Sequence, residues 1–382
     1  MSKYKVEFTL KQHTPMIHFQ AKPKDEGATL RGTELKPKFD KFLIEYFKKE
    51  NIAYKDFLIP GQKKALNYKV RVEEVNESES KPLIYESGFI GNMDDNAEKK
   101  YEKFSKGVIY LSFHSFYSPL ILAIENNFST FLLKENFGAR TSKGFGSFYL
   151  FDNRSQTYIQ PDFTKIDKDI YTFNTTRNTC IGAIKLLNDF FRSGLNLPDP
   201  KDKNRSRVYV KSALFSYLQD KTNISYEKKQ IKHFFTNKGV EEDTKATLAR
   251  ELFGLSVRQE WGKEYDGMII TKKHNSITRF KSPLIFKAFI LDDIEAKATA
   301  AMKVYFWADD SYKAMLGKEF TVRSSNHRDN LLLRVPETFS FDDFFHYIAT
   351  EYTFSVDRTY ESQDEVKNLR KMIQEIKESS NG

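Results

Sequence analysis

Hydrophobic and polar residues alternate from Lys5 to Gln12, which places Val6, Phe8 and Leu10 on one face. A period of two residues is typical of a β-strand with one buried face. From Glu34 to Glu50, apolar side chains instead recur every three or four residues, which predicts an amphipathic helix. Further strands are predicted at Lys69–Val75, Val108–Phe116 and Ser147–Phe151, and a second helix at Leu120–Leu133.

The order of these elements is strand, helix, strand, strand, helix, strand, which is the ferredoxin-like or RRM-like arrangement. We therefore predict a ferredoxin-like domain over residues 1–155. The rest of the chain predicts a second, divergent ferredoxin-like domain with helical insertions over residues 156–360. A charged helical segment, residues 361–382, ends the chain. It either docks on the surface through its apolar stripe or binds a partner. The predicted fold class is α+β.

The second domain mixes helices and strands. Helices are predicted at Thr179–Arg192, Tyr226–Phe235, Thr244–Phe253 and Phe341–Tyr352, and strands at Met268–Thr271, Ile277–Leu291 with a bend at Ser282–Pro283, Met302–Trp307 and Leu331–Val335. The helix of the C-terminal segment is predicted at Asp364–Lys377.

A glycine-rich stretch, residues 136–150 (NFGARTSKGFGSFYL), joins the second predicted helix to the fourth strand. Its glycines and cations are Gly138, Arg140, Lys143, Gly144 and Gly146. Glycine lets the backbone turn tightly and approach a bulky ligand. Exposed N–H groups beside cations form an anion-binding concavity. The aromatic Phe145 either packs under the loop or stacks on a base.

The position of this loop excludes two nucleotide-binding motifs. A Rossmann fingerprint follows a strand and opens a helix, whereas this loop precedes a strand. A P-loop ends in Gly-Lys-Ser/Thr, whereas Lys143 precedes Gly144. The arrangement suits an RNA-backbone cradle, in which N–H groups and cations meet phosphates. The alternative is a tight turn with incidental charge.

Basic residues also gather near the predicted start of the first helix, where the helix N-terminus itself attracts phosphate. They are Arg31, Lys36, Lys38 and Lys41. The alternative is a charged, solvated helix face.

A third basic span, Gly267–Leu291, contains no acidic residue. Its cations are Lys272, Lys273, Arg279, Lys281 and Lys287. Such an excess is typical of a phosphate-contacting surface, and the alternative is a strand edge protected by lysines. The loop 201–211, which ends at Lys211, adds further cations against Asp202 alone.

Composition supports an anionic partner. The chain of 382 residues has a formal charge of +9 and a pI of about 9.1, which favours nucleic acid. A basic surface of no consequence is the alternative. The single cysteine, Cys180, excludes a disulfide framework and a Cys-rich zinc site. With no secretory signal and no long apolar run, we expect a cytoplasmic protein without a membrane span.

The seven histidines show no HExxH or paired spacing, so no metal site and no cofactor are predicted. His18, in the loop after the first strand, is the best candidate for an RNA-cleaving residue because that loop would lie near the basic cradle. A lone loop histidine is more often not catalytic.

Several motifs together resemble the RAMP superfamily of CRISPR-associated proteins. The segments TPMIHF (14–19) and LRGTELKPKFDKFL (30–43) resemble the start of that superfamily's first helix, and FGARTSKGFGSF (137–148) resembles its glycine-rich loop. ELFG (251–254) and RFKSPLIFK (279–287) resemble second-domain motifs. The order of features is most similar to the two-domain capping subunit of type III-B effector complexes.

This resemblance implies a non-catalytic subunit that binds guide RNA and target RNA and docks on other RAMP subunits. It would cap the guide–target duplex through phosphate contacts, with target cleavage left to a different subunit. The resemblance places RNA contacts at Arg31, Lys36, Gly138, Arg140, Lys143, Gly144, Gly146, Arg279 and Lys281. The charge and aromatic pattern described above adds Lys38, Phe145 and Lys211 to the expected RNA-binding residues.

Two other functions remain open from the sequence. One is a metal-independent endoribonuclease of the same superfamily that processes CRISPR repeat RNA, with His18 as general acid or base. The other is an interaction protein whose basic face meets an acidic protein partner.

Overall fold

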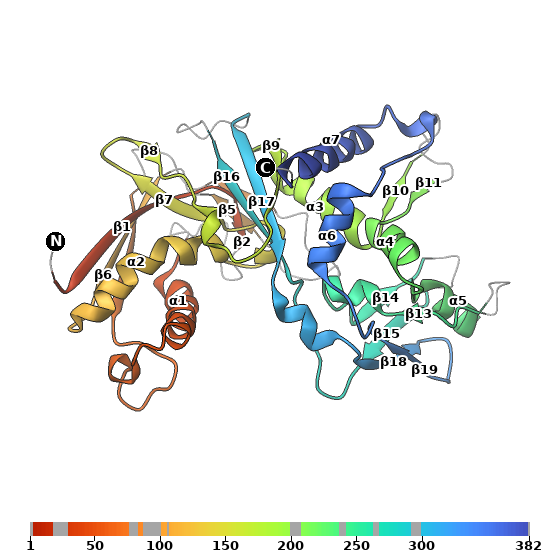
Figure 1. Ribbon diagram of the computed structural model, residues 1–382, viewed down its shortest axis with the longest axis horizontal. Helices are drawn as coiled ribbons and strands as arrows, with labels where there is room; N and C mark the ends of the chain where they lie inside the picture. The colour runs from red at the N-terminus through yellow and green to blue at the C-terminus, as the bar shows by residue number, and fades with distance from the viewer. Residues whose placement is uncertain are drawn as a thin grey trace. The chain divides into compact units, whose positions relative to one another are not determined.

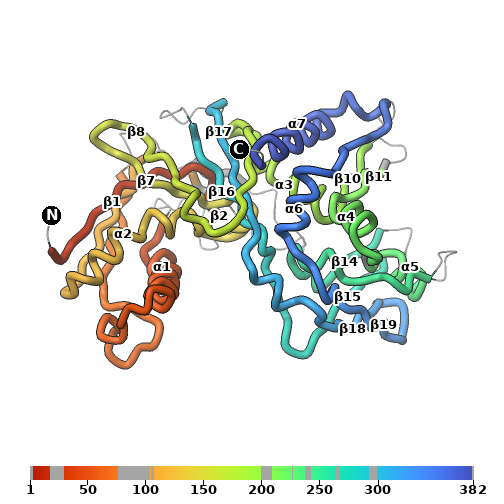
Figure 2. Tube along the Cα trace, viewed as in Figure 1, coloured from red at the N-terminus to blue at the C-terminus, as the bar shows by residue number. Residues whose placement is uncertain are grey.

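The computed structural model describes residues 3–17, 30–75, 83–86, 101–104, 107–198, 208–236, 242–262, 267–291 and 299–380 (Figure 1). The chain forms two compact units. Unit 1 is Met1–Ile170, Asn174–Ile181 and Phe286–Tyr305, and unit 2 is Tyr171–Phe173, Gly182–Ile285 and Phe306–Gly382. Figure 2 follows the chain, which leaves unit 1 after Ile181 and returns to it at Phe286.

The elements of unit 1 are, in chain order, β1 (Lys5–Gln12), β2 (Met16–Ile17), α1 (Gly32–Lys49), β3 (Lys69–Val75), β4 (Leu83–Glu86), β5 (Tyr101–Phe104), β6 (Val108–His114), α2 (Ser118–Lys134), β7 (Phe148–Asp152) and β8 (Thr157–Tyr158). The strands and helices predicted between residues 5 and 152 are confirmed, with ends that differ by no more than two residues.

The main sheet of unit 1 has the strand order β3-β6-β1-β7-β8. Its neighbouring strands are antiparallel, with Lys5 opposite His114 and Leu10 opposite Leu150. A second sheet has the order β2-β5-β4.

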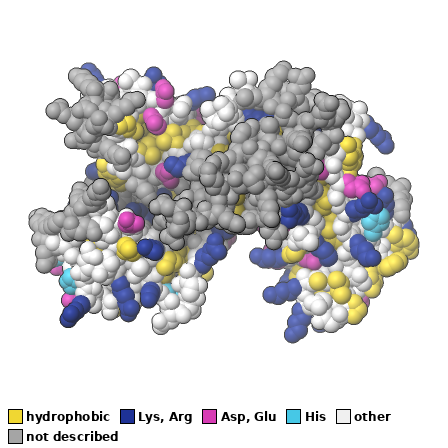
Figure 3. Space-filling view, turned by 180° about the vertical axis from the view of Figure 1, so that it is seen from behind, with side chains coloured by type: hydrophobic (Ala, Val, Ile, Leu, Met, Phe, Trp, Pro, Cys, Tyr) yellow, Lys and Arg dark blue, Asp and Glu magenta, His cyan; other side chains and the backbone are white. Residues whose placement is uncertain are grey.

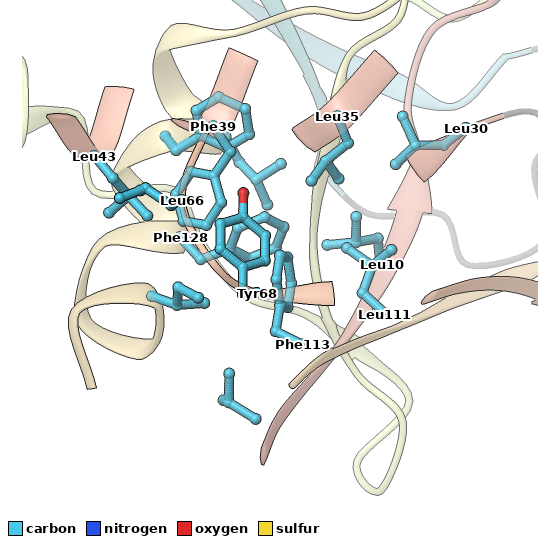
Figure 4. Close-up of a cluster of buried hydrophobic side chains, with 14 of the residues drawn as sticks. Leu10, Leu30, Leu35, Phe39, Leu43, Leu66, Tyr68, Leu111, Phe113 and Phe128 are labelled. Carbon is cyan, nitrogen blue, oxygen red and sulfur yellow. The ribbon is translucent and has the colours of Figure 1, made fainter. Parts of the chain in front are cut away.

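Apolar side chains of α1 and α2 form one core with the inward residues of the main sheet. Leu35, Phe39 and Leu43 of α1 point toward Tyr68, Phe113 and Phe128 in Figure 4. Phe39 and Phe113 are fully buried, with ring centroids 5.8 Å apart. The alternation in the strands and the 3.6-residue stripe in the helices thus meet in a single apolar layer.

Helix α1 begins two residues before the predicted start at Glu34. Its N-cap residue is Arg31 in an extended conformation, and Pro37 lies inside the helix. Pro37 therefore removes one intrahelical hydrogen bond.

The elements of unit 2 include α3 (Cys180–Arg192, whose first two residues belong to unit 1), β10 (Leu195–Leu197), β11 (Val208–Val210), α4 (Ala213–Lys221), β12 (Ser225–Tyr226), α5 (Lys228–Thr236), β13 (Ala246–Thr247), β14 (Arg258–Glu260), β15 (Ile269–Lys273), β18 (Glu319–Ser324), β19 (Leu331–Arg334), α6 (Phe341–Thr350) and α7 (Asp364–Ser379). Strands β9 (Tyr171–Thr176), β16 (Leu284–Ile290) and β17 (Ala301–Ala308) pair in the order β16-β17-β9, and the division into units falls within each of them.

Unit 2 has its own sheet, in the order β14-β15-β18-β19. Its core contains an aromatic cluster in which Phe191 of α3 packs against Phe344 and Phe345 of α6. Helix α7 contacts α6 and buries an apolar stripe that includes Leu369 and Ile373. Both folded units combine helices with antiparallel sheets, so the predicted α+β class is confirmed.

Two predictions for the second half of the chain differ from the structure. The strand predicted over Ile277–Leu291 is confirmed only from Leu284 to Ile290; it begins directly after Pro283, which has no N–H to donate to a ladder. The helix predicted over Thr244–Phe253 is instead β13 followed by a 3-10 helix, Ala249–Phe253.

Candidate nucleic-acid interface

The glycine-rich loop of unit 1 is closed at its base by the buried side chain of Asn136. Asn136 Nδ2 donates to Thr141 O across 2.7 Å and to Phe286 O across 2.8 Å. Its Oδ1 accepts from Ser147 Oγ and from Lys287 Nζ, both at 2.9 Å. One amide therefore ties the start, the middle and the end of the loop to β16.

Thr14 fixes the other end of the loop. Its hydroxyl group donates to Gly144 O across 2.6 Å and accepts from Ser147 N at 2.9 Å. Gly146 N donates to Pro15 O across 2.8 Å. Because the groups on both sides of the loop are buried or partly buried, these bonds hold the loop in one conformation.

Glycine is required at two positions of the loop. Gly138 has φ +84°, and a Cβ there would lie 2.6 Å from Ile17 O. Gly146 has φ +73°, and a Cβ there would lie 1.8 Å from Phe137 O. The close approach that glycine permits is therefore made to the protein's own backbone at these two positions.

The start of α1 joins the loop directly, so two basic features of the sequence meet in one place. Glu34 Oε1 accepts a hydrogen bond from Gly138 N. Lys38 Nζ donates to Asn136 O across 2.6 Å and lies over the ring of Phe137 at 5.1 Å. Lys38 is thus a structural partner of the loop as well as a cation beside it.

Arg140 lies at the turn of the loop with its side chain exposed. Its backbone is left-handed, at φ 55° and ψ 33°, and caps the 3-10 helix Thr141–Lys143. Although Arg140 is exposed to solvent, neighbouring protein atoms displace part of the water around its guanidinium group, and this desolvation lowers the pKa of Arg140 from its ordinary value. A guanidinium group still carries its charge at neutral pH. Lys143, half-buried, completes the pair of cations.

The other residues of unit 1 that were predicted to bind RNA are less accessible to a ligand. Lys36 Nζ donates to both carboxylate oxygens of Asp40 and lies 3.8 Å above the ring of Tyr68. Phe145 is 1% exposed, so its ring packs under the loop and offers no face to a base. Arg31 is half-buried at the N-cap of α1.

Among the predicted cations of unit 2, Lys211, Arg279 and Lys281 are exposed. Lys272 is not: it is 1% exposed and bound to Glu251, so the predicted phosphate-contacting role is wrong for it. The same correction applies to Lys287, which is fully buried in unit 1. On the face drawn in Figure 3, the coloured Lys and Arg side chains are spread over the surface and do not form one patch.

The histidine candidate for catalysis, His18, lies outside the described residues. His13, which lies five residues before His18 in the sequence, is buried. The Nδ1 atom of His13 accepts a hydrogen bond from Ile290 N at 2.9 Å. Burial, reinforced by Lys287, Arg177 and Lys11, holds the pKa of His13 well below 6.5, so the imidazole is neutral. His13 therefore packs as a neutral ring, stacked on Phe289 with centroids 5.0 Å apart.

The described part of the chain contains no cluster of three or more His, Cys, Asp or Glu side chains arranged to hold a metal ion. No helix in it has the length and apolar content needed to cross a bilayer.

Sequence reasoning missed the residues that shape the loop: Thr14, Glu34 and Asn136. Asn136 was visible as the first residue of the glycine-rich stretch, but its acceptor Phe286 O lies 150 residues away. Thr14 bonds across 130 residues. No local pattern predicts such partners.

Two protein-family models match most of the chain. A family model described as the Cmr1 N-terminal domain matches residues 3–195, and one described as the Cmr1 C-terminal domain matches residues 209–377. No curated protein matches. Among solved structures, the chain is similar to apo Cmr1 from Pyrococcus furiosus, with 11% identity, a TM-score of 0.37, and coverage of 80% of this chain and 88% of that chain.

Proposed function

Because this chain belongs to the Cmr1 family, we propose that it is a non-catalytic, RNA-binding subunit of a type III CRISPR effector complex. Family membership supports the coarser part of this statement, a subunit of a type III-B effector. The finer part is that the chain caps the guide–target RNA duplex through phosphate contacts, in the cytoplasm, docked on other RAMP subunits.

The fold of unit 1 supports this assignment. Its elements β1, α1, β3, β6, α2 and β7 follow the strand–helix–strand–strand–helix–strand order, and their sheet order is β3-β6-β1-β7. We infer a ferredoxin-like domain from this order. A divergent second domain of the same kind in unit 2 remains part of the proposal.

The observation that carries the proposal is the exposed Arg140 on a loop that hydrogen bonds fix on both sides. A loop that is already rigid adds no cost of ordering its backbone when one of its side chains binds phosphate. Arg also matches phosphate geometry with paired N–H groups. Because the N–H groups of Phe137, Gly138, Ala139 and Gly146 donate within unit 1, the side chains of Arg140 and Lys143 would provide most of the attraction.

The test is the salt dependence of RNA binding. We expect the double variant Arg140→Ala/Lys143→Ala to bind a guide–target RNA duplex more weakly at low salt. The slope of log K against log salt should become shallower by roughly 0.7–0.9 for each phosphate that the variant no longer neutralises. Fluorescence anisotropy across a salt series measures both quantities.

The matched control removes the same charge elsewhere on unit 1. Lys48 and Lys49 are exposed in the last turn of α1, about 21 Å along the helix from Glu34 at 1.5 Å per residue. The variant Lys48→Ala/Lys49→Ala should therefore change binding far less. If the two double variants weaken binding equally, the loop contributes to RNA binding only through the overall charge of the chain.

The non-catalytic assignment has its own test. Purified protein incubated with CRISPR repeat RNA and EDTA should leave the RNA intact. A defined cut that is lost in His18→Ala would replace this proposal with a metal-independent endoribonuclease.

A further inference from the structure

One corner of unit 1, at the opposite end of β1 from the glycine-rich loop, exposes aromatic rings. Phe116, just after β6, is 92% exposed, and Tyr4, just before β1, is 49% exposed. Ser115 N donates to Tyr4 O across 3.2 Å, which brings the two segments together. An almost fully exposed phenylalanine on a folded surface gains nothing from burial in the chain itself.

Basic side chains lie on the strands next to these two aromatic residues. Lys5, His114 and Lys69 lie side by side across β1, β6 and β3, since His114 pairs with both lysines in the strand register. Lys69 and His114 are exposed. Lys3, next to Tyr4, is exposed as well.

The acidic groups on this corner are few. Glu7 forms an ion pair with Lys5 at 2.6 Å. One row further along the sheet, Arg71 is paired with Glu73 at 2.5 Å. Lys3, Lys69 and the aromatic rings lie beyond these pairs at the end of the sheet, so the corner keeps a positive balance.

We propose that Phe116 and Tyr4, with Lys3, Lys5, Lys69 and His114, form a stacking platform for unpaired nucleotides of single-stranded RNA. Sequence-tolerant binding of single strands combines aromatic faces for the bases with cations for the backbone, and this corner presents both. An apolar protein partner would need a broader apolar patch, whereas the residues that pair at this end of the sheet are Lys5, His114 and Lys69. The inference relies on the proposed RNA-binding function only for its ligand.

The platform is separate from the loop. Strand β1 runs for eight residues between Lys5 and Gln12, or roughly 26 Å at 3.3 Å per residue, and the loop joins its far end through Thr14. A single-stranded extension of an RNA duplex would therefore meet the platform several nucleotides away from the loop.

The experiment measures the affinity of the full chain for a labelled oligouridylate of about 12 nucleotides, a length suited to such grooves. We expect Phe116→Ala to weaken binding roughly tenfold and Phe116→Ala/Tyr4→Ala to weaken it further. Phe116→Trp should bind at least as well as the parent chain. The control Leu122→Ala removes another exposed apolar side chain, 56% exposed on α2, and should bind like the parent.

The variant Phe116→Leu separates stacking from simple apolar contact. It keeps the apolar surface but loses the aromatic face, so it should lose most of the affinity that Phe116→Ala loses. Parent-like binding by Phe116→Leu or by Phe116→Ala would overturn the proposal. So would a loss of protein partners without a loss of RNA affinity.

Crosslinking provides a direct readout. With 5-iodouridine in the RNA, we expect peptide adducts at Phe116 or Tyr4, and adducts confined to other regions would refute the platform. The loop proposal fails independently, because it depends on the salt slope of the Arg140→Ala/Lys143→Ala variant. Loss of stacking should instead shift the whole salt curve and leave its slope unchanged.

Discussion

At the scale of single residues, Lys287 is a buried basic group that holds the base of the glycine-rich loop. Its Nζ donates to Glu135 O and Asn136 Oδ1, both at 2.9 Å, inside unit 1. Burial lowers the pKa of Lys287 from 10.5 to about 7, with Glu135 opposing and Lys38 reinforcing the shift. The ammonium group is thus costly to bury as a cation.

The sign of its pH dependence follows from this lowered pKa. Between about pH 7 and 10.5, the unfolded chain keeps the proton on Lys287 and the folded chain does not. The free energy of unfolding should therefore rise with pH in that window, by at most about 1.4 kcal/mol per pH unit. Below pH 7 both the folded and the unfolded chain hold the proton on Lys287, so the gain in the free energy of unfolding from its deprotonation is absent.

A comparison with Lys287→Met isolates the effect, because other titrating groups cancel in the difference. Denaturant unfolding at pH 6, 8 and 10 should show the parent gaining stability over the variant as pH rises. A constant difference across the three pH values would mean that Lys287 titrates near its ordinary pKa.

Single residues also show how much of the structure can be predicted from the sequence. The burial of Lys287 can be predicted from the sequence, because Lys287 interrupts the apolar run LIFKAFI. Such runs are typical of strands buried on both faces. The hydrogen-bond partner of Lys38 cannot be predicted from the sequence, because Asn136 O lies 98 residues away along the chain. A cation beside a helix start looks the same in sequence whether it meets phosphate or a backbone carbonyl.

At the scale of elements, β15 shows the same limit within one strand. Lys272 and Lys273 are adjacent, yet Lys272 is buried and Lys273 is exposed. Successive side chains of a strand point to opposite faces, so the sequence predicts that only one of them faces solvent. Which of the two is buried depends on Glu251 and Glu227, which are distant along the chain.

Lys272 belongs to a buried ion network in unit 2. Its Nζ lies 2.5 Å from Glu251 Oε1 and 3.8 Å from Glu227 Oε1. Burial alone would raise the pKa of Glu227, but Arg250 and Lys272 hold it below its ordinary value. Glu227 is therefore ionised at neutral pH and requires its cations.

We expect Lys272→Met to lower the free energy of unfolding by about 3–5 kcal/mol, because it removes a buried cation that two buried carboxylates, Glu251 and Glu227, share. Lys273→Met is the matched control on the same strand and should change stability by less than about 0.5 kcal/mol. Urea unfolding of both variants decides the matter. Similar stability of the two variants would show that the network does not depend on Lys272.

At the scale of the whole molecule, unit 1 is not continuous in sequence. The segment Phe286–Tyr305 belongs to it, although more than a hundred residues of the chain lie between Ile181 and Phe286. A boundary drawn once along the chain, whether at residue 155 or between the matched ranges that end at 195 and begin at 209, leaves this segment on the other side. Hydrophobic patterning identifies strands but does not say which unit a returning strand joins.

A fragment of residues 1–195 should therefore fold poorly. It lacks Phe286 O and Lys287, both partners of Asn136, and it lacks Ile290 N and the Phe289 ring, both partners of His13. Buried polar groups without partners each cost roughly 1–3 kcal/mol, a large share of a typical stability of 5–15 kcal/mol.

We expect this fragment to lose cooperative thermal unfolding and near-ultraviolet circular dichroism. The same fragment, fused through a flexible Gly/Ser linker to residues 284–308, should recover both, because such a linker spans the gap without imposing a geometry. If the fragment 1–195 melts as cooperatively as the fused form, the returning segment is dispensable and Asn136 and His13 find other partners. The glycine-rich loop would then be fixed by β1 and α1 alone, and its rigidity, on which RNA binding by Arg140 depends in this proposal, would originate within the first half of the chain.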